Sequence, residues 1–231
     1  DMLSLKQGLS LNTIKPAPFP ASLSASTLAK QEAWYRKNTG FVSTVMPKLA
    51  AWNDQSSNNI NMLQLNAIEQ PSIATNGIVT FDGSDNLQSP SQISLTGDYT
   101  IGVVLKPTGT VSNYAVLGDN TTAGQFIKLF DDNTIYIKSG GTVKGISFST
   151  AQKFSDGGYF VLTRDNSNFT LYWNGEQEAQ VAAVAGTQLI DTIGGRYIDT
   201  EDYVGDITEI MIFSTTSPIL TNEINARFAT L

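Results

Sequence analysis

The chain has 231 residues, of which 41% are hydrophobic and 15% charged, and it contains neither cysteine nor histidine. The absence of these two residue types excludes disulfides, thiolate and imidazole metal sites, the Ser-His-Asp triad and cysteine nucleophiles. A net charge of −7 argues against binding to nucleic acid, which requires a basic surface, and no apolar run reaches the roughly 20 residues that span a bilayer.

The first 48 residues differ in composition from the rest of the chain. The segment KPAPFP at 15–20 is rich in proline, which favours an extended arm. A helix is predicted over Ser26–Asn38, with a serine cap before it and Gly40 after it. Two interpretations remain open for this helix: it covers an edge of the main domain, or it anchors the chain to another subunit.

From about Val79 onward the hydrophobic pattern changes to a period of two, which is typical of half-buried strands. Turn residues separate these strands at short intervals, and Asn174-Gly175 gives the strongest hairpin signal because a type I′ turn requires positive φ at both positions. A strand near 203–213 alternates less cleanly, which indicates burial on both faces. A short helix, capped by Thr221 or Asn222, is predicted to close the chain.

Many short strands without βαβ alternation predict an all-β fold of two packed antiparallel sheets, a jelly-roll sandwich. We expect an N-terminal arm with a short helix over residues 1–48, as a candidate docking segment, and the sandwich over residues 49–231. The stretch VTFDGSDNLQ at 79–88 is predicted to be a strand that ends in an Asp82-Gly83 turn. It lacks the ligand spacing and the final glutamate of an EF-hand calcium loop.

A series of motifs occurs in order along the chain: LAAWNDQSSNN at 49–59, NGIVTFDGSDNL at 76–87, DYTIGVVLK at 98–106, LYWNGE at 171–176 and VGDITEIMIF at 204–213. In these motifs the chain resembles the concanavalin A-like or laminin-G-like jelly rolls of phage structural proteins and bacterial secreted proteins. The resemblance covers most of residues 34–231, although Ser56-Ser57-Asn58-Asn59 stands where the family usually has glycines.

The resemblance implies a structural calcium ion held between an early loop and the last strand, with Asp54, Asp206 and Glu209 as the candidate ligands. Carboxylate oxygens suit calcium. The alternative is that Asp54 caps a turn and Glu209 is solvated.

Two kinds of site are suggested by the acidic segment RYIDTED at 196–202. The resemblance to laminarinase-like glycosidases draws attention to Asp199 and Glu201, but Tyr197 occupies the place of the family's first glutamate, so catalysis is the weaker hypothesis. Sugar binding requires exposed aromatic rings beside carboxylates and amides. On this criterion the candidate ligand-binding residues are Tyr197, Asp199, Asp202 and Tyr203, with the alternative that the tyrosines pack into the core.

These observations favour a non-enzymatic virion or surface structural protein, such as a phage decoration, fibre or tail component, whose exposed sandwich binds host glycans. Its expected partners are other subunits of the assembly, bound through the arm, or further copies of itself, and its expected location is the virion or the cell surface. The alternative functions are a secreted carbohydrate-binding module and, less favoured, a glycoside hydrolase. No cofactor is expected beyond the structural calcium.

Overall fold

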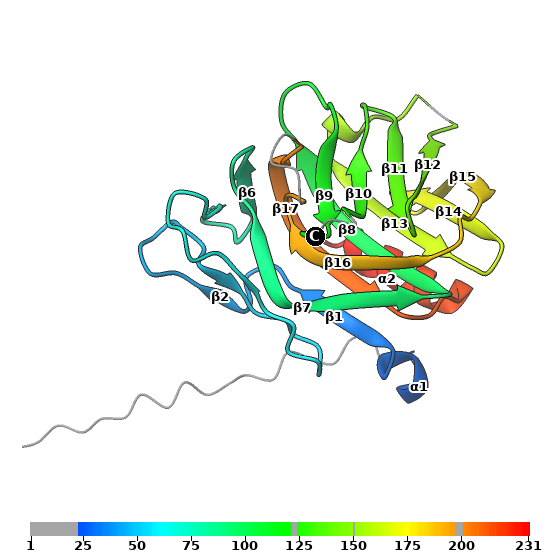
Figure 1. The fold of residues 1–231 in the computed structure, drawn as a ribbon, viewed down its shortest axis with the longest axis horizontal. Coiled ribbons are helices and arrows are strands. Elements are labelled where there is room, and N and C mark those ends of the chain that lie inside the picture. Colours follow the sequence, from blue (N-terminus) through cyan, green and yellow to red (C-terminus); the bar gives the residue numbers. More distant parts are fainter. Residues whose placement is uncertain (1–22, 122–123, 150, 197–200) are drawn as a thin grey trace, which may run out of the picture.

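The computed structural model describes residues 23–121, 124–149, 151–196 and 201–231. Within these ranges the chain forms two antiparallel sheets, one of eight strands and one of nine, which pack face to face (Figure 1). The predicted all-β sandwich is therefore confirmed.

The first sheet, here called sheet A, has the strand order β15-β14-β13-β8-β17-β6-β5, and β1 also pairs with β17. Its strands are β1 (Gln31–Tyr35), β5 (Ser72–Ile73), β6 (Val79–Asp82), β8 (Tyr99–Pro107), β13 (Gly158–Arg164), β14 (Asn168–Trp173), β15 (Glu176–Ala182) and β17 (Val204–Phe213). The second sheet, sheet B, has the order β12-β11-β10-β9-β16-β7-β4-β3-β2. Its strands are β2 (Phe41–Val42), β3 (Ala51–Trp52), β4 (Met62–Leu63), β7 (Leu87–Thr96), β9 (Tyr114–Gly118), β10 (Phe126–Leu129), β11 (Thr134–Ser139), β12 (Thr142–Ser147) and β16 (Thr187–Ile193).

The main core lies between the two sheets, because alternate residues of each strand point inward. The inward set includes Ile101 and Val103 of β8 and Phe169 and Leu171 of β14, as the alternating pattern predicts. Strand β17 is buried along most of its length, which confirms the expectation for the last strand.

A second apolar cluster lies on the outer face of sheet A, under helix α2 (Pro218–Phe228). Figure 1 shows this helix behind sheet A, on the side away from sheet B. Leu220 and Ile224 of the helix pack on Val161 and Met211 of the sheet. The predicted closing helix is confirmed, but its predicted cap is wrong. Ser217 is the N-cap, because its Oγ accepts a hydrogen bond from the Leu220 N–H at 3.1 Å.

The helix predicted over Ser26–Asn38 is wrong. Only α1 (Ala25–Leu28) is helical there, and β1 follows it at once. Strand β1 pairs with β17, so that Tyr35 enters the main core while Trp34 packs in the outer cluster. The local sequence is compatible with either structure, and the open edge of β17 decides for the strand.

Two strands that precede residue 49 pair with strands of the sandwich: β1 with β17 and β2 with β3. Residues 1–22 lie outside the described part of the chain, and a docking role for the first 48 residues stays a prediction. Among the described residues, no helix combines the length and the apolar composition that a bilayer crossing requires.

Two turns have the conformation that the sequence predicts. Asn174 and Gly175 both have positive φ, 49° and 89°, and they join β14 to β15. Strand β6 ends at Asp82 with Phe81 in the core, and Gly83 follows with φ of 93°. The Asp82 carboxylate accepts hydrogen bonds from the backbone N–H and the hydroxyl of Ser84, at 2.9 and 2.8 Å. This segment is therefore a turn closed by an aspartate side chain.

Candidate functional site

The turn between β10 and β11 forms one side of the candidate site. It consists of Asp131, Asp132 and Asn133 and lies on the rim of the sandwich. The Asn133 N–H donates to Asp131 Oδ1 at 3.0 Å, which closes the turn locally. The Asp132 carboxylate accepts two hydrogen bonds from Ser155, one from its N–H at 2.8 Å and one from its hydroxyl at 2.7 Å. The turn is thus fastened to the segment that faces it.

The facing segment runs from Ala151 to Ser155 and leads into a short 3₁₀ helix, η1 (Phe154–Asp156). Phe154 fixes it to the core: its buried ring packs edge-on against Trp173, with centroids 5.2 Å apart, and tilted against Phe148 at 4.6 Å. Both sides of the site are therefore held by core or hydrogen-bond contacts.

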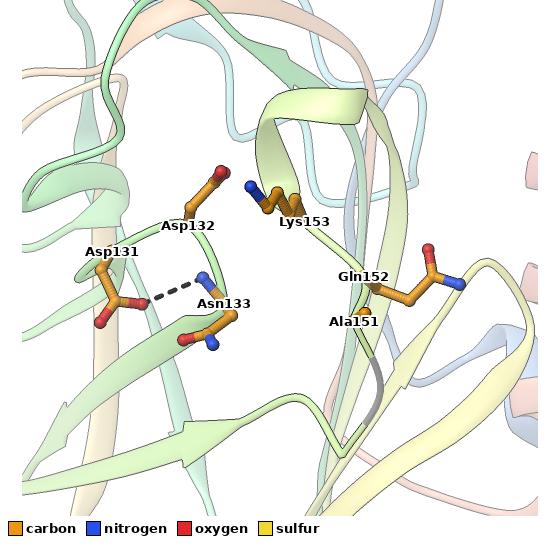
Figure 2. A pocket seen from close by; sticks show the side chains of 6 residues that line it. All are labelled: Asp131, Asp132, Asn133, Ala151, Gln152 and Lys153. Atoms are coloured by element: carbon orange, nitrogen blue, oxygen red, sulfur yellow. Dashed lines mark hydrogen bonds between the residues drawn. The ribbon is translucent and has the colours of Figure 1, made fainter.

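Between these two segments lies a hollow of about 400 Å³. This volume is within the range of small-molecule sites. Figure 2 shows the turn on one side and residues 151–153 on the other, with the Asp132 and Lys153 side chains pointing toward one another. The described residues that line the hollow are Asp131, Asp132, Asn133, Ala151, Gln152 and Lys153.

An aromatic pair adjoins the turn. Phe130, which directly precedes Asp131, stacks on Tyr136 with ring centroids 4.1 Å apart and planes 6° apart. Phe130 remains 36% exposed. The rings lie on the outer face of sheet B, because Ile127, Leu129 and Ile135 of the same strands point into the core. We call the hollow and this aromatic pair together the rim site.

The rim site combines carboxylates, amides, an ammonium group and an exposed flat ring. Carboxylates and amides hydrogen-bond to sugar hydroxyls, and an aromatic face stacks on the apolar face of a sugar ring. Asp131 Oδ2 takes part in no hydrogen bond within the described residues, so that it can accept one from a ligand. The arrangement supplies binding groups that are fixed in place by the fold.

The structure separates the residues that the sequence predicts as ligand-binding. Tyr197 and Asp199 lie outside the described residues. Asp202 lines another hollow, of about 360 Å³, together with Ile68, Glu69, Gly83, Ser84 and Asn86. Tyr203 is fully buried beside Phe81, and its hydroxyl donates to the Asp206 carbonyl at 3.0 Å. Burial also raises the pKa of Tyr203 well above its usual value, with a further contribution from the Asp206 carboxylate.

Tyr203, which directly precedes β17, is therefore a core residue and not an exposed ligand-binding ring. Its neighbour Asp202 forms an isolated bridge with Ala115 of β9, which holds the segment against sheet B. A ligand-binding role for Tyr197, Asp199 and Asp202 stays a prediction.

The Asp82 turn forms part of the wall of the hollow that Asp202 also lines. It contains two carboxyl groups, Asp82 and Asp85, whose pKa values shift in opposite directions. Hydrogen bonds from Ser84 lower the pKa of Asp82. Burial, with the negative charge of Asp82 beside it, raises the pKa of Asp85 to about 6. Asp85 accepts from the Asp82 N–H at 3.1 Å, and its other oxygen is 3.9 Å from the Lys48 ammonium without a hydrogen bond.

The three candidate calcium ligands have other partners. Asp54 accepts hydrogen bonds from the Trp34, Ser56 and Ile60 N–H groups and from the Ser56 hydroxyl, at 2.6 to 3.0 Å. It therefore closes its own loop and joins it to β1. Asp206 accepts from the Thr80 hydroxyl on the neighbouring strand at 2.6 Å.

Glu209 is fully buried on the outer side of β17, and neither the calcium nor the solvated interpretation describes it. Arg227 of α2 binds both of its oxygens, one through Nε and the other through Nη2 at 2.8 Å. The Trp34 indole N–H also donates to it at 2.8 Å. No three Asp, Glu, His or Cys side chains within the described residues are grouped to hold a metal ion. Asp54, Asp206 and Glu209 do not fit the calcium site that the resemblance implies.

The suggested catalytic carboxylate Glu201 is paired with two cations. Its oxygens lie 3.0 Å from Lys128 Nζ and 2.7 Å from the Arg196 guanidinium, and both cations lie over the Phe126 ring. Asp199, the other member of the suggested pair, lies outside the described residues. Glu201 therefore has a structural partnership in which its charge is already balanced.

The site residues predicted from the sequence do not include Asp131-Asp132-Asn133, Phe130 or Tyr136. One signal was present: an aromatic residue lies on each side of a polar turn. The second side of the hollow could not be found in this way, because residues 151–153 approach the turn only in the folded chain.

Two packed antiparallel sheets with a helix across one outer face define a jelly-roll sandwich. A family profile described as the concanavalin A-like lectin/glucanases superfamily matches residues 81–218. The match covers more than half of the chain, and the chain belongs to this superfamily. A search of curated proteins finds no match.

Several solved structures share the fold at low sequence identity. The ligand-binding domain of botulinum neurotoxin serotype D, in complex with N-acetylneuraminic acid, has a TM-score of 0.59 at 13% identity, over 89% of this chain and 52% of that one. The binding domain of Paraclostridial Mosquitocidal Protein 1 has a TM-score of 0.57 at 14% identity, over 88% and 53%. This chain thus spans about half the length of the two toxin domains.

Domain 4 of AbnA, a GH43 extracellular arabinanase from Geobacillus stearothermophilus, was solved in complex with arabinotriose. It has a TM-score of 0.55 at 14% identity, over 86% of this chain and 98% of that one. At these identities the similarity establishes the fold alone.

Proposed function

We propose that this chain is a non-catalytic glycan-binding module and that the rim site holds the sugar. The observation that carries the proposal is the hollow of about 400 Å³, whose Asp131–Asn133 turn directly follows the exposed Phe130 of the stacked Phe130–Tyr136 pair. Hydrogen-bonding groups and an exposed ring thus come from one short segment, and sugar recognition uses both.

Two further observations support the proposal. Structures with this fold include a toxin domain solved with N-acetylneuraminic acid and an arabinanase domain solved with arabinotriose. Lys153, on the rim, offers a charge partner for an acidic sugar such as the former. One of these structures is a ligand-binding domain and the other is domain 4 of an arabinanase, each in complex with a sugar, which favours binding over catalysis.

A glycan array that contains sialylated oligosaccharides and arabinan fragments, followed by calorimetric titration of the best ligand, tests the proposal. Phe130→Ala is expected to weaken binding at least about tenfold, and Lys153→Ala about fivefold to tenfold. Lys144→Ala on β12 is the matched control for loss of one positive charge, and we expect it to leave affinity unchanged. Absence of any bound glycan, or affinity that neither rim variant changes, would contradict the proposal.

The finer proposal is that this module belongs to an exposed assembly, such as a virion or a cell surface, and binds its other subunits. The distribution of exposed aliphatic side chains supports it. Val45 and Met46 lie between β2 and β3, and Leu65 and Ile68 lie between β4 and β5, all largely exposed. The two connections are joined, because Lys48 Nζ donates to the Gln70 carbonyl at 2.7 Å and Leu49 N–H to the Pro71 carbonyl at 2.8 Å. Such patches favour protein contacts.

Light scattering on the full chain, on residues 23–231 and on the Met46→Ser/Leu65→Ser double variant tests this finer proposal. An oligomer that becomes a monomer after either change is the expected result. Monomers in all three samples, with no partner recovered on the intact assembly, would contradict it without affecting the glycan proposal.

A further inference from the structure

The outer face of sheet A is only partly covered. Helix α2 packs mainly on β13 and β8, so that the outer sides of β14 and β15 are less covered by it. A hollow of about 290 Å³ lies along this edge. Its lining residues are Thr163, Asp165, Thr170, Tyr172, Gln180, Thr216, Ser217, Pro218 and Thr221. We call it the helix-edge hollow.

The floor of the helix-edge hollow is a row of three polar side chains on adjacent strands. Thr163 of β13 is opposite Thr170 of β14, which is opposite Gln180 of β15. They point outward because Leu162 and Leu171 on the same strands point into the core. The Gln180 amide N–H donates to the Thr170 hydroxyl at 3.0 Å, which leaves the Gln180 carbonyl oxygen available as an acceptor.

The two walls have apolar faces. Pro218, the first residue of α2, forms part of one wall, and its position is set by the Ser217 cap. Tyr172 lies two residues from Thr170 on the same outer face of β14, half-buried against the outer apolar cluster. A half-exposed tyrosine presents both a ring and a hydroxyl to whatever occupies the hollow.

Two threonine hydroxyls line the hollow without a protein partner. Thr163 is 8% and Thr221 4% exposed as whole residues, and within the described residues neither hydroxyl hydrogen-bonds to the protein. Both residues line the helix-edge hollow, so that an occupant that displaces water from it can hydrogen-bond to these hydroxyls.

The charge of the lining limits the class of ligand. Asp165 is the one charged group among the described residues that line the hollow, and its Oδ1 is used by the Ser167 and Asn168 N–H groups at 2.8 and 2.7 Å. No lining residue could balance the charge of an acidic ligand. Hydroxyl, amide and ring groups instead complement an uncharged molecule with many hydroxyls.

We propose that the helix-edge hollow is a second ligand site, separate from the rim site, that binds a neutral sugar unit between Tyr172 and Pro218. The two sites lie at opposite ends of β13. Residues 151–153 of the rim site precede the first residue of this strand, whereas Thr163 and Asp165 of the helix-edge hollow lie at its last residues or just after them. At about 3.3 Å per residue this separates them by roughly 17 Å along the strand. The chain would then hold two sugars at once.

Titration of the isotope-labelled full chain, followed by amide NMR, tests the second site. The probes are four neutral trisaccharides, maltotriose, cellotriose, xylotriose and mannotriose, with sialyllactose as the acidic comparison. We expect at least one neutral probe to shift the amide signals of Tyr172, Gln180 and Thr221. Absence of such shifts for all four at about 20 mM, enough to detect a millimolar Kd, would overturn the proposal. Shifts caused only by sialyllactose would overturn the neutral class.

Variants assign the effect to the hollow. Thr163→Val removes a hydroxyl and keeps the side-chain shape, and it should weaken the neutral probe about fivefold. Tyr172→Ala should weaken binding of the neutral probe at least about tenfold. If Tyr172→Ala does not fold, Gln180→Ala, at the exposed end of the polar row, tests the same hollow instead. Lys144→Ala on β12, which lines neither hollow, is the control and should leave this affinity within roughly twofold. If Thr163→Val and Gln180→Ala both bind the neutral probe as tightly as the wild type, the assignment to this hollow is contradicted. If instead the rim-site variants leave glycan affinity unchanged, that result contradicts only the proposal for the rim site.

Discussion

Two groups of carboxylates in this fold show how burial decides what an acidic side chain does. Asp54 and Glu209 are buried, and every oxygen of both accepts hydrogen bonds from the protein. Asp131, at the rim, accepts a single hydrogen bond from the part of the chain that the structure describes, and it lines a hollow with Lys153. A carboxylate whose acceptors are all used holds the fold together, and one with a free oxygen beside a hollow is available to a ligand.

The comparison also explains why three acidic residues near the chain ends resemble a metal site in the sequence. Glu209 joins three elements: its own strand β17, Trp34 of β1 and Arg227 of α2. The arginine supplies the positive charge that a calcium ion would otherwise provide. The ion pair thus joins α2 to β17, and the Trp34 hydrogen bond joins β1 to the same carboxylate.

The largest effect is expected from Arg227→Ala. It leaves the Glu209 charge buried without its cationic partner and should lower the free energy of unfolding by about 3–5 kcal/mol. Urea denaturation measures this change, with the exposed Lys30→Ala as a control that should stay within about 0.5 kcal/mol. If calcium restored the stability of this variant, the Glu209 site would accept an ion. The distinction between carboxylates that hold the fold together and carboxylates that are available to a ligand would then fail.

A second effect concerns Asp85, which is buried but lacks a full set of donors. Because its folded pKa of about 6 exceeds the ordinary 3.8, the folded state retains a proton that the unfolded chain releases. Its contribution to stability is therefore fully present below about pH 4 and is lost as the pH rises through 6, by up to roughly 3 kcal/mol.

Unfolding measured between pH 4 and 7 should show this loss in the wild type, beyond the change that other groups cause. Asp82 and Lys48 are the charged groups beside Asp85. Asp85→Asn should remove the loss, whereas Asp156→Asn, an exposed carboxyl on η1, should retain it. The same pH dependence in the wild type and Asp85→Asn would assign the titration to another group.

A smaller effect is expected from Ser155→Ala, which removes the hydroxyl bond to Asp132 Oδ2. Stability should fall by about 1 kcal/mol, the usual value of one hydrogen bond. Because this contact fastens one side of the rim site to the other, glycan affinity should fall as well. Ser167→Ala, in the exposed turn after β13, is the control. Weaker stability with unchanged affinity would show that the rim site does not need this contact.

The smallest effect on stability is expected from Lys153→Ala. The side chain is exposed, so that its loss should change the free energy of unfolding by less than about 0.5 kcal/mol. If affinity for an acidic glycan falls in the same variant, Lys153 contributes to binding and not to stability, in contrast to the structural role of Glu209. A loss of 2 kcal/mol or more, roughly the range of a buried contact, would place Lys153 with the structural residues instead.

Much of the fold could be predicted because it depends on local patterns. The alternation in YTIGVVLK and FTLYW, the Asn174-Gly175 turn and the Asp82-Gly83 turn each act within a few residues, and all have the expected structure. The Ser26–Asn38 helix was wrong because its sequence permits either structure, and pairing with β17 decides between them.

The candidate sites depended on contacts between distant parts of the chain. Tyr203 and Glu209 carry side chains common at functional sites, and only the packing of β17 shows that both are buried. Both sides of the rim site, Asp131–Asn133 and residues 151–153, are polar loops by sequence, and the helix-edge hollow joins β13 to α2 across more than fifty residues.

The amino-acid sequence by itself therefore determined the all-β class, the hairpins and the inward side of most strands, because period and turn chemistry act over a few neighbouring residues. The tertiary structure alone decided which carboxylates were used up by buried donors and which polar loops met around a hollow. Those outcomes depend on packing between residues far apart in the chain, and no local pattern records them.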